Sequence, residues 1–179
     1  DRIVTGVLDQ QVVEADIAHG QPEGEPFGLM FRALDDRKPG EAYVCTGSHG
    51  AFALWGELMS TRAARLGATG AVVDGFHRDT RGIRRLGFPV FSAGAYAQDQ
   101  RPRGRVTDFR VPITFGNGAV LRPGDVIVGD IDGVLAIPGE HVADIVAAAL
   151  TKAGIERDVE QAIVAGEATT AIFARTGIM

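Results

Sequence analysis

The chain has 179 residues, of which 45% are hydrophobic and 23% are charged, and its formal net charge is −5. This composition is typical of a soluble globular protein, and the length can bury one sizeable core, so we expect a single domain over residues 1–179. No stretch approaches the roughly 20 apolar residues of a membrane span. The acidic balance gives no overall attraction to nucleic acid. A membrane protein and a nucleic-acid-binding protein are therefore not expected.

Residues 1–46 begin with a strand-like run at 2–8, followed by a polar Gly/Pro/Glu segment at 19–26. A helix is predicted over 27–36, and a strand over 41–46 after the turn signal Pro39-Gly40. The single cysteine, Cys45, falls in that strand and is expected to be a buried, unreactive thiol. One cysteine cannot form an internal disulfide, and no secretory signal opens the chain, so we expect a cytoplasmic protein.

The next segment, "WGELMSTRAARLGATGAVVDGFHRD", predicts a helix that begins after Gly56 and a strand over 72–77. A helix of about 12 residues spans about 18 Å, and a strand of five or six residues runs about as far back. If the short "GATG" link reverses the chain, the start of the helix meets the end of the strand. Glu57 would then face Arg78 and Asp79 across a small gap.

Residues 111–138 carry three turn signals between apolar runs and predict a β-meander, with type I′ turns at Asn117-Gly118 and Asp132-Gly133. The stretch "DIDG" resembles the start of a calcium loop, but the later ligand positions of that motif are missing, so a hairpin turn is favoured. Residues 139–166 predict helix, interrupted at Gly154 before a second helical segment.

The gap beside Arg78 has a definite chemistry. A helix N-terminus offers unpaired N–H groups to a carboxylate, and Gly56 lets a ligand approach the backbone. Arg78 adds a permanent charge that can hold an oxyanion. Asp79 and Glu57 are oxygen ligands suited to a hydrated magnesium-like ion. Together these groups indicate a 2-oxo-acid site, although an Arg-Asp pair after a strand is by itself also a common surface ion pair.

Three segments in order, "WGELMSTRAARLGATGAVVDGFHRD", "FPVFSAG" and "PGDVIVGDIDGVLAIP", carry a family resemblance. They resemble the class II pyruvate aldolases related to 4-hydroxy-4-methyl-2-oxoglutarate aldolase. That family includes the regulator of ribonuclease activity A. The resemblance covers roughly residues 40–170. It implies an α/β fold, layered β/β/α, of the phosphohistidine swivelling type. It also implies a homotrimer or hexamer with active sites between subunits.

The resemblance implies a role for each matching residue. The segment Gly56-Glu57-Leu58-Met59 looks like the loop whose amides take the pyruvate carboxylate. Arg78 matches the arginine that contacts the pyruvate oxygens, and Asp79 matches the residue that binds Mg²⁺ or Mn²⁺. Glu57 falls at the position where relatives carry an acidic residue that holds metal-bound water. Glu156 loosely matches an acid contributed by the adjacent subunit.

The expected reaction is therefore cleavage of a 4-hydroxy-2-oxo acid through a pyruvate enolate, with oxaloacetate decarboxylation as a related activity. The alternative is a noncatalytic regulator of a ribonuclease. A dehydrogenase or transferase is disfavoured, because no Gly-x-Gly-x-x-Gly follows a strand. The family's Gly-Asp-Asn segment is missing from residues 23–44, so either the acceptor end of the pocket differs or the protein is not an efficient aldolase.

Further residues near the motif are candidates for the same pocket. Trp55 and His49 lie just before the loop and could shape the acceptor end, with packing favoured for Trp55, while His77 is expected to point away from the metal side. Eight arginines between residues 78 and 110 predict a solvated face or a subunit contact. The alternatives are a second-sphere anion trap for dicarboxylate substrates and, least favoured, a nucleic-acid surface, because aromatic residues suited to base stacking are scarce among them. The eight arginines are Arg78, Arg81, Arg84, Arg85, Arg101, Arg103, Arg105 and Arg110.

Overall fold

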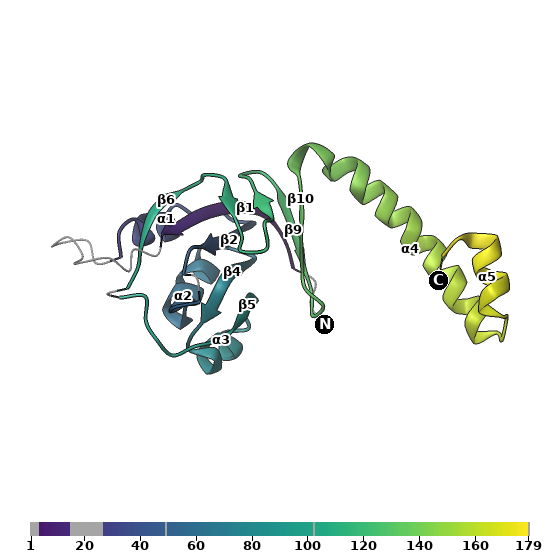
Figure 1. Ribbon diagram of the computed structural model, residues 1–179, viewed down its shortest axis with the longest axis horizontal. Helices are drawn as coiled ribbons and strands as arrows, with labels where there is room; N and C mark the ends of the chain where they lie inside the picture. Colours follow the sequence, from purple (N-terminus) through teal and green to yellow (C-terminus); the bar gives the residue numbers. More distant parts are fainter. Residues whose placement is uncertain (1–3, 15–26, 49, 102, 179) are drawn as a thin grey trace. The chain divides into compact units, whose positions relative to one another are not determined.

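The computed structural model describes residues 4–14, 27–48, 50–101 and 103–178 (Figure 1). The predicted polar segment at 19–26 and His49 lie outside the described residues. The chain divides into two compact units, Asp1–Gly139 and Glu140–Met179, and the residues of each unit contact one another. The expectation of one domain over residues 1–179 stays a prediction.

An eight-stranded sheet forms the centre of the first unit, with the order β10-β9-β1-β2-β4-β3, while β5 pairs with β4 and β6 with β1. Strands β1, β2, β3, β4 and β5 run parallel to one another. Strands β6, β9 and β10 are antiparallel to their neighbours. The strands are β1 (Val4–Glu14), β2 (Glu41–Thr46), β3 (Ala53–Trp55), β4 (Gly70–His77), β5 (Val90–Ala95), β6 (Arg105–Phe109), β9 (Val126–Gly129) and β10 (Val134–Ile137).

Three helices, α1 (Met30–Asp35), α2 (Glu57–Arg65) and α3 (Thr80–Leu86), pack into one core with the sheet. Because side chains alternate along a strand, Tyr43 and Cys45 of β2 join this core. Intervening Val44 joins a second core with Ile113, Leu121 and Ile127. The sheet is therefore packed on both faces, and the predicted helices near 27–36 and after Gly56 are confirmed.

The predicted meander is in fact two hairpins in different sheets. Strands β7 (Ile113–Thr114) and β8 (Val120–Leu121) form a separate two-stranded sheet, whereas β9 and β10 extend the main one. Both predicted turns join strands, but the type I′ assignment is wrong. Gly118 and Gly133 have positive φ, while among the described non-glycine residues only Asp79 and Arg110 do. A type I′ turn needs positive φ at both central positions.

The second unit holds α4 (Val142–Val164) and α5 (Thr169–Thr176) after the short 3-10 turn η1 (Gly139–His141). The predicted break at Gly154 is wrong, because α4 continues through it for 23 residues. A central glycine costs a helix only about 1 kcal/mol, which the good helix formers around it offset.

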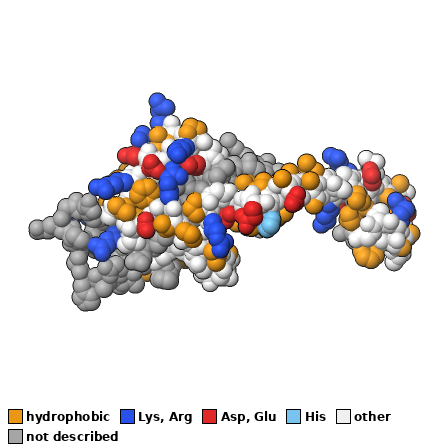
Figure 2. Space-filling model, turned by 90° about the horizontal axis from the view of Figure 1, so that it is seen from above, with side chains coloured by type: hydrophobic (Ala, Val, Ile, Leu, Met, Phe, Trp, Pro, Cys, Tyr) orange, Lys and Arg blue, Asp and Glu red, His pale blue; other side chains and the backbone are white. Residues whose placement is uncertain are grey.

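Val159 and Ile172 are buried in this unit, but Leu150 and Val164 are exposed. Figure 2 shows hydrophobic side chains on the surface of these helices between charged ones. No helix among the described residues is both long and apolar enough to cross a bilayer.

Taken as a whole, the chain is mixed α/β with C-terminal helices, as expected. The label of a β/β/α swivelling-type fold stays a prediction.

Candidate functional site

The candidate site forms where two neighbouring parallel strands end together. Trp55, the last residue of β3, pairs with His77, the last residue of β4. The backbone N–H of Arg78 then donates to the carbonyl oxygen of Trp55 at 2.8 Å. Because the carboxyl ends of parallel strands meet at one edge of a sheet, the segments that follow, Gly56-Glu57 and Arg78-Asp79, lie side by side. The predicted meeting of helix start and strand exit is confirmed.

Gly56 allows this close approach because it has no side chain. A Cβ built on Gly56 would lie 2.8 Å from Oδ2 of Asp79, so any larger residue would push the carboxylate away. The backbone N–H of Glu57 donates to the same oxygen at 3.2 Å. The N–H groups of Leu58 and Met59 have no hydrogen-bond partner among the described residues. The start of α2 therefore keeps two amides open for an anion.

Asp79 adopts a left-handed backbone conformation, with φ 61° and ψ 33°, immediately before α3. Such a conformation costs a non-glycine residue on the order of 1–3 kcal/mol, and this kind of strain is frequent at functional sites. Here it turns the chain from β4 into α3 while the carboxylate faces Gly56 and the N–H of Glu57.

The guanidinium of Arg78 lies between two carboxylates. Its Nη2 is 3.5 Å from Oδ2 of Asp99, and its Nε is 4.0 Å from Oδ2 of Asp79. At these distances both aspartates attract the cation, but neither forms a short hydrogen bond with it. The side chain is 40% exposed, so its N–H groups can be offered to a ligand.

Glu57 is held in place by α3. Its Oε1 accepts a hydrogen bond from Nη2 of Arg85 at 2.8 Å, and a Cβ built on Gly82 would overlap its carboxyl group. The glycine thus leaves the room that the glutamate occupies, and the arginine pairs with its charge. Glu57 is near Asp79 through its backbone, while its carboxylate is directed to α3.

A metal ion at this position would depend on few protein ligands. Within the described part of the chain, no three His, Cys, Asp or Glu side chains come together as a ligand group. Mg²⁺ often binds through one or two carboxylates and retains several waters. The side chain of Asp79 is 41% exposed, so its carboxylate fits that mode, whereas the carboxylate of Glu57 is already paired with Arg85.

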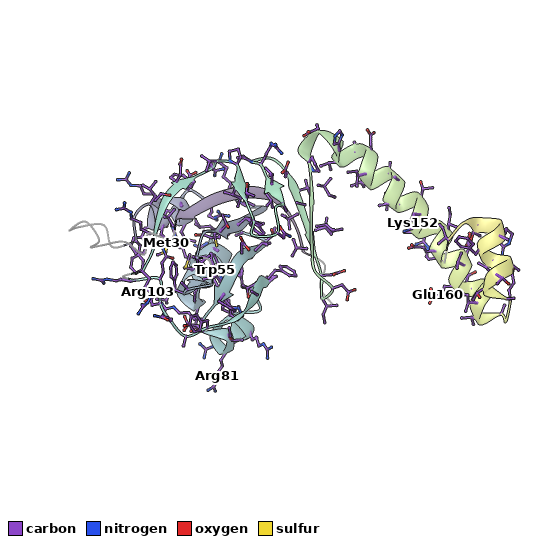
Figure 3. The ribbon with its side chains drawn as sticks, viewed as in Figure 1. Met30, Trp55, Arg81, Arg103, Lys152 and Glu160 are labelled. Atoms are coloured by element: carbon purple, nitrogen blue, oxygen red, sulfur yellow. The ribbon has the colours of Figure 1, made fainter. Side chains whose placement is uncertain are left out.

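A cavity of about 390 Å³ opens beside these groups. Figure 3 shows Met30 and Trp55, two of its lining residues, near one another over the sheet. Trp55 is 1% exposed and packs on Tyr43, with the ring centroids 4.4 Å apart, so its expected packing role is confirmed. The cavity lining comprises Phe27, Met30, Phe31, Leu34, Asp35, Ala53, Leu54, Trp55, Gly56, Leu58, Met59, Arg62, Arg78, Asp79, Asp99 and Gln100.

His77 lies outside this cavity lining. Its ring nitrogens contact Ser92 Oγ at 2.7 Å and Thr80 Oγ1 at 2.9 Å. Burial, and next the positive charge of Arg84, lower the pKa of His77 below its ordinary value. The ring is therefore directed away from the lining, and it belongs to a hydrogen-bonded network between β4, β5 and α3.

Sequence reasoning missed Asp99, Gln100 and Phe31 as neighbours of the site. The first two come from the loop after β5, and Phe31 comes from α1. No local pattern marks them. Glu156 lies in α4 of the second unit, where it pairs with Lys152 at 3.5 Å, and its contribution to a neighbouring subunit's site stays a prediction.

Comparison with known proteins gives the family. The sequence profile described as RraA-like, Aldolase/RraA, matches residues 12–136, which include every residue of the cavity lining. The chain belongs to the RraA-like family. The resemblance read from the sequence motifs is thereby confirmed.

One relative of this RraA-like chain is a Halalkalibacterium halodurans protein named "Putative 4-hydroxy-4-methyl-2-oxoglutarate aldolase". The two are 34% identical over 135 residues, which cover 75% of this chain and 63% of the relative. The next two curated relatives are covered over 22% and 54% of their length. The chain thus spans less than two thirds of the first curated relatives that it matches.

Two solved structures share the RraA-like fold. An uncharacterized protein from Pseudomonas syringae pv. tomato matches with a TM-score of 0.83 and 24% identity, over 96% of this chain and 75% of that one. Streptomyces coelicolor RraAS2, described as an unusual member of the RNase ES inhibitor RraA family, matches with a TM-score of 0.78 and 24% identity, over 90% and 79%. At these identities the likeness shows the fold alone.

Proposed function

We propose that this RraA-like protein is a divalent-metal-dependent lyase that cleaves a 4-hydroxy-2-oxo acid to pyruvate and a carbonyl compound. The observation that carries the proposal is the meeting of the α2 amides with Arg78 and Asp79 at the ends of β3 and β4. The aldolase names of curated relatives support the same reaction class.

Substrate binding begins at the start of α2. The carboxylate of a 2-oxo acid accepts hydrogen bonds from the N–H groups of Leu58 and Met59, where the helix dipole favours negative charge. Arg78 then donates to the neighbouring oxo oxygen. Gly56 leaves room for the substrate to lie against the backbone, between the helix and the aspartate.

Cleavage breaks the bond between C3 and C4. The C4 hydroxyl loses its proton and becomes the carbonyl of the leaving fragment, while the bonding electron pair forms the enolate of pyruvate. A proton added at C3 completes pyruvate. Arg78 lowers the barrier because its positive charge lies where the enolate oxygen becomes negative. Glu57, held by Arg85, accepts the hydroxyl proton through an ordered water and returns it to C3.

Asp79 is the residue that would hold the divalent ion, Mg²⁺ or Mn²⁺. When bound, such an ion supplies Lewis-acid stabilisation to the same developing negative charge. Decarboxylation of oxaloacetate also yields the pyruvate enolate, so we propose it as a second activity of the site. We further propose that the protein works as a homotrimer or hexamer, to which Glu156 of a neighbouring copy adds an acid.

The experiment is a pyruvate-release assay on 4-hydroxy-2-oxo acids, with Mg²⁺ added or removed by a chelator. We expect Arg78→Ala and Asp79→Ala each to lower kcat/KM by about 100-fold or more, the scale of losing an oxyanion-stabilising group. Arg81→Ala is the matched control, because Arg81 is an exposed arginine of α3 outside the cavity lining (Figure 3).

Equal pyruvate release by the wild type and both site variants would rule out the lyase. Without any pyruvate release, the remaining candidate is a noncatalytic regulator of a ribonuclease. That outcome would be tested by adding the protein to a ribonuclease assay.

A further inference from the structure

The cavity beside Arg78 extends well beyond the groups that a pyruvate unit needs. The carboxylate and oxo group occupy only the end formed by Gly56, Arg78 and Asp79. The rest of the lining is built largely from apolar side chains of α1 and α2, including Met30, Phe31, Leu34, Leu58 and Met59. With a volume of about 390 Å³, the cavity falls in the size range of small-molecule sites.

The charges in the cavity lining disfavour a carboxylate at the far end of a substrate. Two arginines lie there, and each is paired: Arg62 Nε is 2.8 Å from Asp35 Oδ1, and Arg78 Nη2 is 3.5 Å from Asp99 Oδ2. Asp79 adds a third carboxylate to the lining. A negatively charged far end of a substrate would meet these aspartates, because Arg62 is paired with Asp35 and Arg78 holds the 2-oxo-acid end.

Gln100 offers a buried hydrogen-bond donor to a ligand in the cavity. Its side chain is buried, with 3% exposed, and it is part of the lining. Its Nε2 has no hydrogen-bond partner among the described residues. A buried donor without a partner is rare in folded proteins, and a ligand oxygen entering the cavity would satisfy it.

We propose that the substrates of this site are 2-oxo acids whose carbon chain beyond C4 is apolar, rather than acids that carry a second carboxylate beyond C4. The proposal rests on the proposed lyase function for the position of the 2-oxo-acid end, and it adds the substrate class. Phe31 and Met30 of α1 contact the apolar chain, and the α2 amides and Arg78 hold the charged end.

The test compares 2-oxohexanoate with 2-oxoadipate, which differ only in a terminal methyl against a terminal carboxylate. Trp55 is the only tryptophan of the chain and lines the cavity, so its fluorescence reports binding. Since each buried methylene strengthens binding about fourfold, we expect 2-oxohexanoate to bind about tenfold or more tightly than pyruvate, and 2-oxoadipate more weakly than 2-oxohexanoate.

Substitutions test which part of the cavity binds the apolar chain. Phe31 is 56% exposed, so Phe31→Asp should fold, and we expect it to weaken 2-oxohexanoate about tenfold and pyruvate, which has no chain to place against α1, by less. Leu86→Asp is the matched control, because Leu86 is an exposed residue of α3 outside the cavity lining. Equal or tighter binding of 2-oxoadipate, or no binding of either acid, would overturn the proposal.

Pyruvate release from the corresponding 4-hydroxy-2-oxo acids separates this proposal from the lyase function. If 2-oxohexanoate binds as expected but neither hydroxy acid is cleaved, the lyase assignment fails and the ligand preference stands. If both are cleaved with the same kcat/KM, the lyase stands and the preference for an apolar chain is wrong.

Discussion

Arg85 and Glu57 form an ion pair that joins the last turn of α3 to the first residue of α2, with Nη2 2.8 Å from Oε1. The pair fixes where the Glu57 carboxylate lies, and Gly82 leaves the space for it. Exposed ion pairs typically contribute less than about 1 kcal/mol to stability. We therefore expect its importance to lie in positioning the acid.

Gly82→Ala tests this arrangement. Alanine favours a helix by about 1 kcal/mol over glycine, but its methyl group would overlap the Glu57 carboxyl group. We expect Gly82→Ala to destabilise the wild type by about 1 kcal/mol or more and to stabilise a Glu57→Ala background. Urea unfolding of the four proteins measures both effects. Equal changes in the two backgrounds would mean that Glu57 does not occupy this space.

Asp79→Gly and Asp79→Ala separate backbone strain from chemistry. Both remove the carboxylate that accepts from the N–H of Glu57, but only glycine relieves the left-handed conformation at φ 61°. We expect Asp79→Gly to be more stable than Asp79→Ala by about 1 kcal/mol, with pyruvate release lost in both. A melting comparison checks the first part. Equal stability would show that the backbone relaxes after the substitution.

His77 predicts a pH dependence of stability. Its pKa in the folded protein is lowered, first by burial and then by Arg84, whereas in the unfolded chain it returns to about 6.5. Below that pH the unfolded state binds more protons, so the free energy of unfolding falls as the pH drops from about 7 and levels off below the folded-state pKa. His77→Gln should remove this part of the slope in urea titrations. An unchanged slope would assign it to other groups.

Cys45 should resist thiol reagents in the native state. The residue is fully buried, and burial raises the pKa of its thiol well above the ordinary value, so little thiolate forms at neutral pH. We expect labelling only when the protein unfolds, at a rate that rises with urea. Fast labelling in native buffer would show that β2 opens readily.

The central geometry of the site was predictable because its signals are local. Gly56, Gly67 and Gly70 mark the ends of α2 and the start of β4, and element lengths then bring Glu57 to Arg78. Strand β3 was not predicted, since three residues carry no usable period. Its pairing with β4 is nevertheless what aligns the two segments.

Contacts made by distant loops could not be read from the sequence. Asp99 reaches Arg78 because the loop after β5 pairs with β3 through the Ala53–Asp99 bridge. The sequence around Asp99 has no pattern that predicts this pairing. The apolar part of the cavity depends on where α1 packs, which the polar segment before it does not reveal. The predicted break at Gly154 does not occur, because a single glycine costs little in a long helix.

One short stretch of chain between Ala53 and Arg85 supplies the carboxylate of Asp79, the guanidinium of Arg78 and the open amides at the start of α2. Bringing such near neighbours together carries a small loop-closure cost. The order in which the remaining strands are connected therefore matters little to their geometry. A cut of the chain at the exposed Asn117-Gly118 turn should therefore leave the pocket intact, whereas a cut in the link between α2 and β4 should separate its two halves.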